Sequence, residues 1–160
     1  MKRKKVTEFL ILLSTRGVWV RKWLCEYTNE ENDGRVMRNA CILHSVLLQA
    51  YEENRTSLFS QKNASKPLPV HLLSPATTIK LPPEADDGAP EEFLLSLKVK
   101  SRLAFTQLMR LTKVEEPATA IENALCLHYD LLTRYLRSET FFIRNGRTSQ
   151  FERVGLFTVE

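Results

Sequence analysis

The chain has little of several residue types that would narrow its function at once. Its 160 residues include only five glycines, scattered and without a glycine-rich phosphate-binding loop. There are three cysteines, Cys25, Cys41 and Cys126, an odd number without paired spacing, which argues against a disulfide framework and fits a reducing compartment. No run approaches the ~20 apolar residues that a membrane-spanning helix needs. We therefore expect a soluble, cytoplasmic protein with no membrane partner.

Residues that could carry catalysis or bind a metal are also sparse. Cys41 and His44 share one face of an expected helix, whereas Cys126 and His128 do not, and zinc sites usually have four ligands at recognisable spacing. A cysteine and a distant histidine can form a nucleophile pair, but no surrounding residues supply an activating environment. We interpret these residues as buried and structural, and expect no metal, no cofactor and no enzymatic activity.

The composition is that of a globular domain with a weak preference for anions. Apolar residues make up 43% of the chain and charged residues 26%, which is ordinary for a folded soluble protein. The net charge of +4 permits an anionic partner without requiring one.

The chain divides into three parts by composition. Residues 1–59 form an expected N-terminal helical module, with helices over Val6–Ser14, Val18–Tyr27 and Arg35–Leu58. Residues 60–92 hold six of the seven prolines and read as an extended, poorly ordered linker. Residues 93–160 form a third part. The expected fold class is mainly α with a short β-ribbon.

The third part begins with a short alternating strand, Leu95–Lys100. Its apolar residues Leu95, Leu97 and Val99 lie on one face, and Ser96, Lys98 and Lys100 lie on the other. Amphipathic helices are predicted over residues 101–112 and 117–138, and Pro117 suits the first position of the second helix. Asn145-Gly146 then predicts a β-hairpin.

Size predicts how this strand is paired. The segment from Leu94 to Arg137 has about 44 residues, too few to bury a stable core alone. A single strand also needs a partner. We therefore predict a homodimer, in which two copies of the strand pair antiparallel across a two-fold axis and four helices pack beneath. The expected dimer core consists of Leu97, Val99, Ile121, Leu125 and Leu132.

Residues 94–137 resemble the ribbon-helix-helix family, the group of the Arc and MetJ repressors. The resemblance lies in the alternating strand, the following Arg102–Thr112 helix and the core Ala120–Leu125 of the second helix, and the hairpin tail at 141–154 is similar to that of some bacterial members. The resemblance implies a dimeric DNA-binding regulator or accessory protein of bacterial or phage type. It assigns major-groove base reading to Ser96, Lys98 and Lys100, and a phosphate contact to Arg102.

A second interpretation involves no DNA. Lysines on an exposed strand edge also keep a sheet soluble. Where the family has a turn residue such as glycine before the second helix, this chain has Glu115-Glu116-Pro117, whose carboxylates would repel a phosphate at the helix N-terminus. A dimerisation or scaffold protein in a larger assembly is therefore the alternative.

The N-terminal helices carry one further candidate surface. Trp19, Trp23 and Tyr27 recur at four-residue spacing, interleaved with Arg21 and Lys22. This arrangement fits a face for nucleic acid, a protein partner or a ligand, and it equally fits a core stripe with a solvated basic back. Both interpretations stay open.

Overall fold

The computed structural model describes residues 7–156, which fold into helices and two antiparallel sheets. The strands are β1 (Thr7–Leu13), β2 (Ser57–Gln61), β3 (Leu68–Pro69), β4 (Glu91–Leu97), β5 (Thr140–Arg144) and β6 (Phe151–Val154). The helices are α1 (Thr15–Thr28), α2 (Asp33–Asn54), α3 (Pro75–Thr78), α4 (Val99–Thr112) and α5 (Pro117–Leu136), with a 3₁₀ turn, η1, at Pro83–Asp86. The protein is thus a mixed α/β structure.

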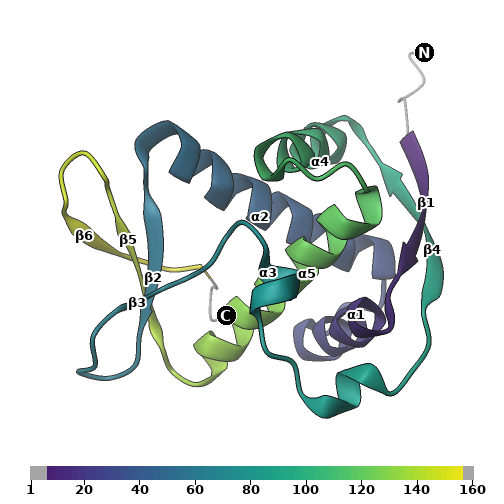
Figure 1. Cartoon of the computed structure of the whole chain (residues 1–160), viewed down its shortest axis with the longest axis horizontal. Helices are drawn as coiled ribbons and strands as arrows, with labels where there is room; N and C mark the ends of the chain where they lie inside the picture. The colour runs from purple at the N-terminus through teal and green to yellow at the C-terminus, as the bar shows by residue number, and fades with distance from the viewer. Residues whose placement is uncertain (1–6, 157–160) are drawn as a thin grey trace.

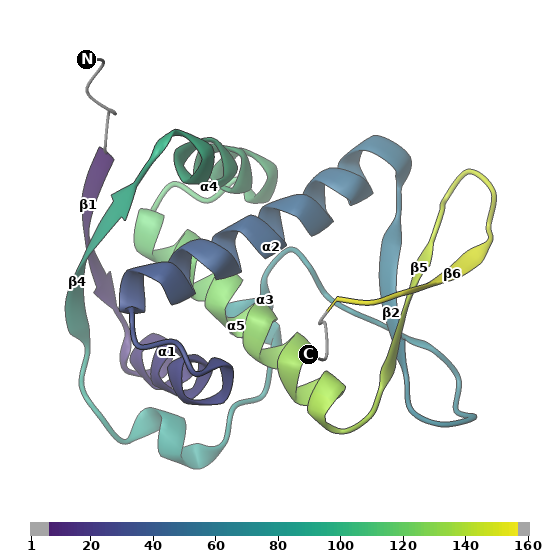
Figure 2. The same cartoon turned by 180° about the vertical axis from the view of Figure 1, so that it is seen from behind.

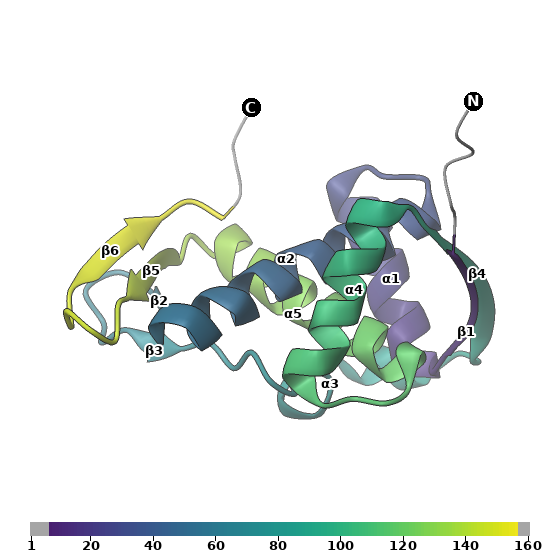
Figure 3. The ribbon, with the colours of Figure 1, turned by 90° about the horizontal axis from the view of Figure 1, so that it is seen from above.

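The two sheets lie at opposite ends of a helical body (Figures 1 and 3). One is a two-stranded ribbon of β1 and β4, and the other has the strand order β3-β2-β5-β6. Between them α2 packs against both α4 and α5, and α1 packs against α5 (Figure 2).

Two β-α-α units of the same design follow one another along the chain. In the first unit, β1, α1 and α2 begin at residues 7, 15 and 33. In the second unit, β4, α4 and α5 begin at residues 91, 99 and 117. Each element of the second unit therefore begins 84 residues after its counterpart in the first. Both helices α1 and α4 have 14 residues, and both end in a left-handed residue, Asn29 (φ 55°) and Lys113 (φ 56°). These two residues are also 84 positions apart.

The strand pairing relates the units by an approximate two-fold axis. Leu10 in the middle of β1 faces its own counterpart Leu94, and the antiparallel register extends equally to both sides. The strands that follow the long helices obey the same relation, because β2 pairs antiparallel with β5 at the other end of the molecule.

Identical side chains at equivalent positions support the repeat. The pattern Asn-Ala-x-x-Leu-His-x-x-Leu-Leu-x-x-Tyr begins at Asn39 in α2 and again at Asn123 in α5. It places small or apolar residues at helical spacing toward the core, where Ala40, Leu48, Ala124 and Leu127 are buried. The chain therefore contains the same supersecondary unit twice.

The core runs through both units. Its buried side chains come from the ribbon (Ile11, Leu13, Leu95, Leu97), from the two long helices, and from Leu24 and Leu108 at equivalent positions of α1 and α4. The expected boundaries at 59/60 and 92/93 do not coincide with any break in this cluster.

The partner of the predicted strand differs from expectation. The strand is β4, it ends at Leu97 rather than Lys100, and it pairs with β1 of the same chain. A helix was expected from Val6 to Ser14, but Thr7–Leu13 form this partner strand, β1, and Ser14 is the N-cap residue of α1. Val6 lies outside the described residues. The strand pair that predicted a homodimer is thus formed within one chain.

The expected dimer core is an intrachain core with one exception. Leu97, Ile121, Leu125 and Leu132 are buried within the chain. Val99 begins α4 instead of continuing the strand, and it is 51% exposed.

The proline-rich segment has more structure than expected. It contains β3, α3 and η1, and it crosses the helical body between β2 and β4 (Figure 1). Val70 and Leu72 are buried, and the amide N–H of Ala76 donates to Asn123 Oδ1 at 3.0 Å. Buried apolar side chains and this hydrogen bond therefore hold the segment against the helical body, although its proline content predicted poor order.

Other predictions about the second unit are confirmed. Helices α4 and α5 lie where periodicity placed them, and β5 and β6 form the expected hairpin, with Arg144 facing Phe151. Within residues 7–156, every helix is too short or too polar to cross a bilayer.

Candidate functional site

The outer face of the β1–β4 ribbon is apolar and acidic. Alternation along each strand turns Phe9, Ile11 and Leu13 inward with their counterparts Phe93, Leu95 and Leu97. The side chains left on the outer face are Glu8, Leu10 and Leu12 of β1 and Glu92, Leu94 and Ser96 of β4. We call these six residues the ribbon face.

Three leucines at the centre of the ribbon face are exposed to solvent. Leu10, Leu12 and Leu94 are 67%, 57% and 61% exposed, and Leu10 lies directly opposite Leu94. Each strand also carries a glutamate on this face, Glu8 opposite Ser96 and Glu92 opposite Leu12. The ribbon face thus presents a contiguous apolar surface flanked by carboxylates.

The predicted base-reading residues do not share one face. Ser96 lies on the ribbon face, opposite Glu8. Lys98 is the N-cap residue of α4, and Lys100 lies in its first turn, both exposed. Arg102, the predicted phosphate contact, donates to Thr7 Oγ1 at 3.5 Å and thereby ties α4 to the start of β1.

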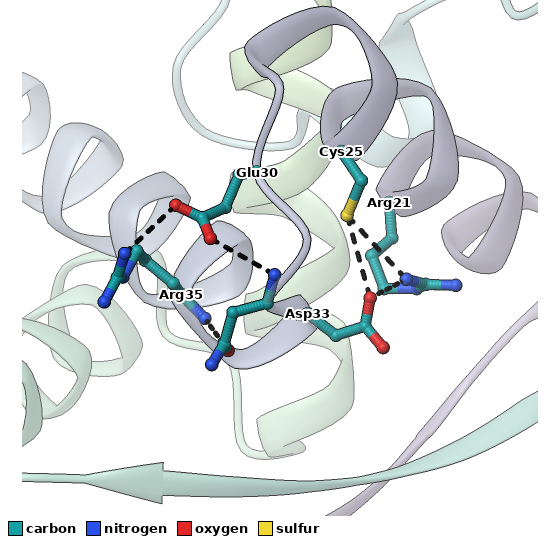
Figure 4. Close-up of polar contacts among 6 residues, drawn as sticks. Arg21, Cys25, Glu30, Asp33 and Arg35 are labelled. Carbon is teal, nitrogen blue, oxygen red and sulfur yellow. Dashed lines mark hydrogen bonds and ion pairs between the residues drawn. The ribbon is translucent and has the colours of Figure 1, made fainter.

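The N-terminus of α2 is filled by the protein's own acidic side chains (Figure 4). Asn32 caps the helix by accepting from the Arg35 N–H at 2.9 Å, and Glu30 accepts from the Asn32 N–H at 3.2 Å and pairs with the Arg35 guanidinium at 3.3 Å. Asp33 in the first turn pairs with Arg21. Carboxylates already satisfy the positive end of this helix dipole, so an external phosphate would meet like charge there.

The equivalent N-terminus of α5 is also acidic. Glu116 is its N-cap residue without a side-chain capping bond, Glu115 precedes it, and Pro117 lacks an N–H donor. The two helix N-termini that flank the ribbon are therefore both unfavourable for phosphate.

Arg21 is the buried cation of this region. It is 6% exposed, its guanidinium pairs with Asp33, and it lies over the Phe93 ring with the guanidinium carbon 4.6 Å from the centroid. Arg21 thus joins α1, the start of α2 and the inner face of β4. Next to it, Cys25 lies 3.7 Å from Asp33 Oδ1, and burial raises the pKa of this thiol although the Arg21 charge acts to lower it.

The cysteines and histidines form no metal centre in the part of the chain that the structure describes. Burial raises the pKa of both the Cys41 and Cys126 thiols to about 12, which keeps them protonated and unreactive at neutral pH. Burial also lowers the pKa of His44 and of His128 to about 4. The Nε2 atom of His44 lies 2.5 Å from the Leu72 carbonyl oxygen, so its N–H holds the proline-rich segment against α2.

No family model, curated protein or solved structure matches the chain.

The residues at the centre of the ribbon face were missed by the sequence analysis. Glu8, Leu10 and Leu12 lie in an apolar run that was read as a helix. A usable signal was present, because Glu-Phe-Leu occurs at residues 8–10 and again at residues 92–94, at the start of each unit. That repetition would have identified residues 7–13 as a second copy of the predicted strand.

Proposed function

We propose that the protein is a non-enzymatic protein-binding adaptor that contacts its partner through the ribbon face. This develops the scaffold interpretation. As part of the same proposal, we interpret the paired strands and the four helices packed with them as a ribbon-helix-helix-like arrangement in which one chain supplies both units.

The observation that carries the proposal is the exposure of Leu10, Leu12 and Leu94 at the centre of the two-stranded β1–β4 ribbon. A row of leucines each more than half exposed has no structural purpose on this face, because the opposite face of the same strands already supplies the core. Contiguous exposed apolar surface flanked by polar groups is typical of protein interfaces.

Charge favours a partner with basic side chains around an apolar centre. Glu8, Glu91 and Glu92 are exposed on or beside the ribbon face. Carboxylates at the rim of an interface attract and orient a positively charged partner more than they add affinity.

The same charges weigh against DNA reading by the ribbon. Insertion into a major groove would bring the carboxylates of Glu8 and Glu92 between two rows of phosphates, and leucines offer no hydrogen bond to base edges. Lys98, Lys100 and Arg102 supply positive charge near the ribbon, but they belong to the start of α4. DNA binding is therefore the competing proposal that the experiment must separate.

Site-specific photo-crosslinking of the full chain tests the proposal. A benzophenone amino acid at position 10 is expected to give one discrete crosslinked protein in cells of the native host, and Leu94→Glu should abolish it. Leu68→Glu is the matched control, because Leu68 is equally exposed (60%) at the opposite end of the molecule. Crosslinks that are unaffected by Leu94→Glu would contradict the proposal.

A DNA shift assay on the same purified chain provides the second arm. We expect no retardation of duplex DNA at moderate salt. Salt-sensitive retardation that Lys98→Ala/Lys100→Ala weakens would favour the DNA-binding regulator instead. If position 10 crosslinks to a second copy of the chain, the ribbon face is a self-association surface, and the adaptor proposal is wrong.

A further inference from the structure

A cleft beside α1 and α5 combines several aromatic rings with positive charge. It has a volume of about 530 Å³ and opens between α1, α5 and the segment that follows α3. Its aromatic lining is Trp23 and Tyr27 of α1 with Tyr129 of α5, and its cationic lining is Lys80, Arg134 and Arg137. We call it the aromatic cleft. Its volume lies within the ~300–1,000 Å³ typical of small-molecule sites.

The aromatic rings form one connected group beside this opening. The Trp23 ring stacks on Tyr27 with centroids 4.2 Å apart, and it meets Tyr129 edge-on at 4.7 Å. Trp23 is half-buried and Tyr27 is 59% exposed. An exposed ring held by a stacked neighbour is a ready surface for another planar ring.

The three cationic side chains of the cleft differ in whether they form ion pairs. Arg134 pairs with Asp130 at 3.2 Å and donates to Ser60 Oγ at 2.6 Å, so it is fixed in place. Arg137 is exposed and pairs with Glu139 at 3.4 Å, and Lys80 is exposed with no ion pair to any described residue. Because Arg134 and Arg137 are each paired with a carboxylate, Lys80 is the lining cation without an ion pair to a described residue, and its charge favours a negatively charged ligand.

The equivalent place in the repeat, between α4 and α2, provides an internal control for what the fold itself requires. The counterparts of Trp23, Tyr27 and Tyr129 are Gln107, Leu111 and Ser45, and those of Arg134 and Arg137 are Ala50 and Glu53. The equivalent pair α4 and α2 thus also packs together, with none of these aromatic or cationic side chains. Helix packing in the repeated β-α-α unit therefore does not require the aromatic and cationic side chains that line the aromatic cleft.

We propose that the aromatic cleft binds a planar aromatic anion of the size of a nucleoside monophosphate. The ring would stack beside Trp23 and Tyr27, and the anionic group would lie toward Lys80 and Arg137. This site lies on α1 and α5, away from the ribbon face, and it does not depend on the adaptor proposal.

Isothermal titration calorimetry of the full chain tests the site with three probes, AMP, UMP and 1-naphthyl phosphate. At least one should bind with a stoichiometry of one, and Trp23→Gln and Lys80→Ala should each weaken it by about tenfold or more. Gln107→Ala and Lys62→Ala are the matched controls, because Gln107 is the counterpart of Trp23 and Lys62 is an exposed lysine that follows β2 and does not line the cleft. Neither should change the affinity.

Two further ligands separate the ring from the anion. Adenosine and inorganic phosphate should each bind far more weakly than the best probe. Absence of heat for all three probes at millimolar concentration, equal binding of adenosine and AMP, or an affinity unaffected by Trp23→Gln would each overturn the proposal. If Trp23→Gln lowers the melting temperature, Tyr27→Leu replaces it, since Tyr27 is exposed and leucine is its counterpart in the second unit.

Discussion

At the scale of single residues, the two units pack different side chains against the equivalent phenylalanines of the ribbon. Phe9 and Phe93 are counterparts on the inner face of the ribbon. Phe9 packs on Phe105 with ring centroids 5.4 Å apart, whereas Phe93 packs under Arg21, and positions 21 and 105 are themselves counterparts. A guanidinium therefore occupies a place that a phenyl ring fills in the other unit, and Asp33 compensates its charge.

Replacing Arg21 by the residue of its counterpart should be tolerated. Arg21→Phe is expected to keep the free energy of unfolding within about 1 kcal/mol of the parent, because a buried ion pair is often replaceable by an apolar side chain. Asp33 is 43% exposed and remains hydrated. Arg21→Ala should cost about 2–4 kcal/mol, since it leaves a cavity under Phe93. Urea unfolding measures both, and equal losses for the two variants would contradict this account.

His44 should make the stability depend on pH. The unfolded histidine has a pKa near 6.5 and the folded one about 4, so between these values the unfolded state binds more protons. The free energy of unfolding therefore falls as the pH falls from 6.5 to 4, by up to about 3 kcal/mol for this group. His44→Gln keeps a donor for the Leu72 carbonyl but cannot titrate. Urea unfolding at pH 7 and pH 4.5 should show a smaller loss for His44→Gln, and an equal loss would exclude His44 as the cause.

At the scale of elements, sequence patterns found the second unit better than the first. The helices after Lys98 and Glu116 show clear 3.6-residue periodicity, and the structure confirms them. The strand was extended too far because Lys98-Val99-Lys100 continues the alternation of Leu95–Leu97, although these residues already begin α4. In the first unit the apolar run Phe9–Leu13 is too short for periodicity to separate helix from strand.

The matched helix ends allow a prediction about capping. Asn29 and Lys113 occupy equivalent left-handed positions after α1 and α4, with φ of 55° and 56°. Asparagine tolerates this conformation better than lysine does. Lys113→Gly should therefore raise the free energy of unfolding by about 1 kcal/mol, and Asn29→Gly by only a few tenths. Thermal melts compare the two variants. A larger gain in stability for Asn29→Gly would show that the positive φ at these positions does not determine the gain.

At the scale of the whole molecule, the β-α-α segment has the pairing partner that its small size requires, and this partner belongs to the same chain. A β-α-α segment of this length does need a second copy to pair its strand and cover its helices. The second copy lies earlier in the same chain, where Glu-Phe-Leu at residues 8–10 and the pattern that begins at Asn39 mark it. Between these two stretches the repeat is hard to see in the sequence, because the buried positions of α1 and α4 accept different apolar residues while keeping their spacing.

The repeat predicts how the protein behaves when it is intact and when it is cut. The intact chain should be a monomer in sedimentation experiments at micromolar concentration, because β4 already pairs with β1 of the same chain. Fragments 1–88 and 89–160, divided after Gly88 in the exposed stretch before β4, should co-purify as a one-to-one complex when they are expressed together. Leu95→Asp should abolish that complex, since Leu95 is buried between the ribbon and the helices, whereas Leu94→Asp, one residue away on the ribbon face, should preserve it. If the fragments fold separately, or if both substitutions act alike, the two units do not form one core.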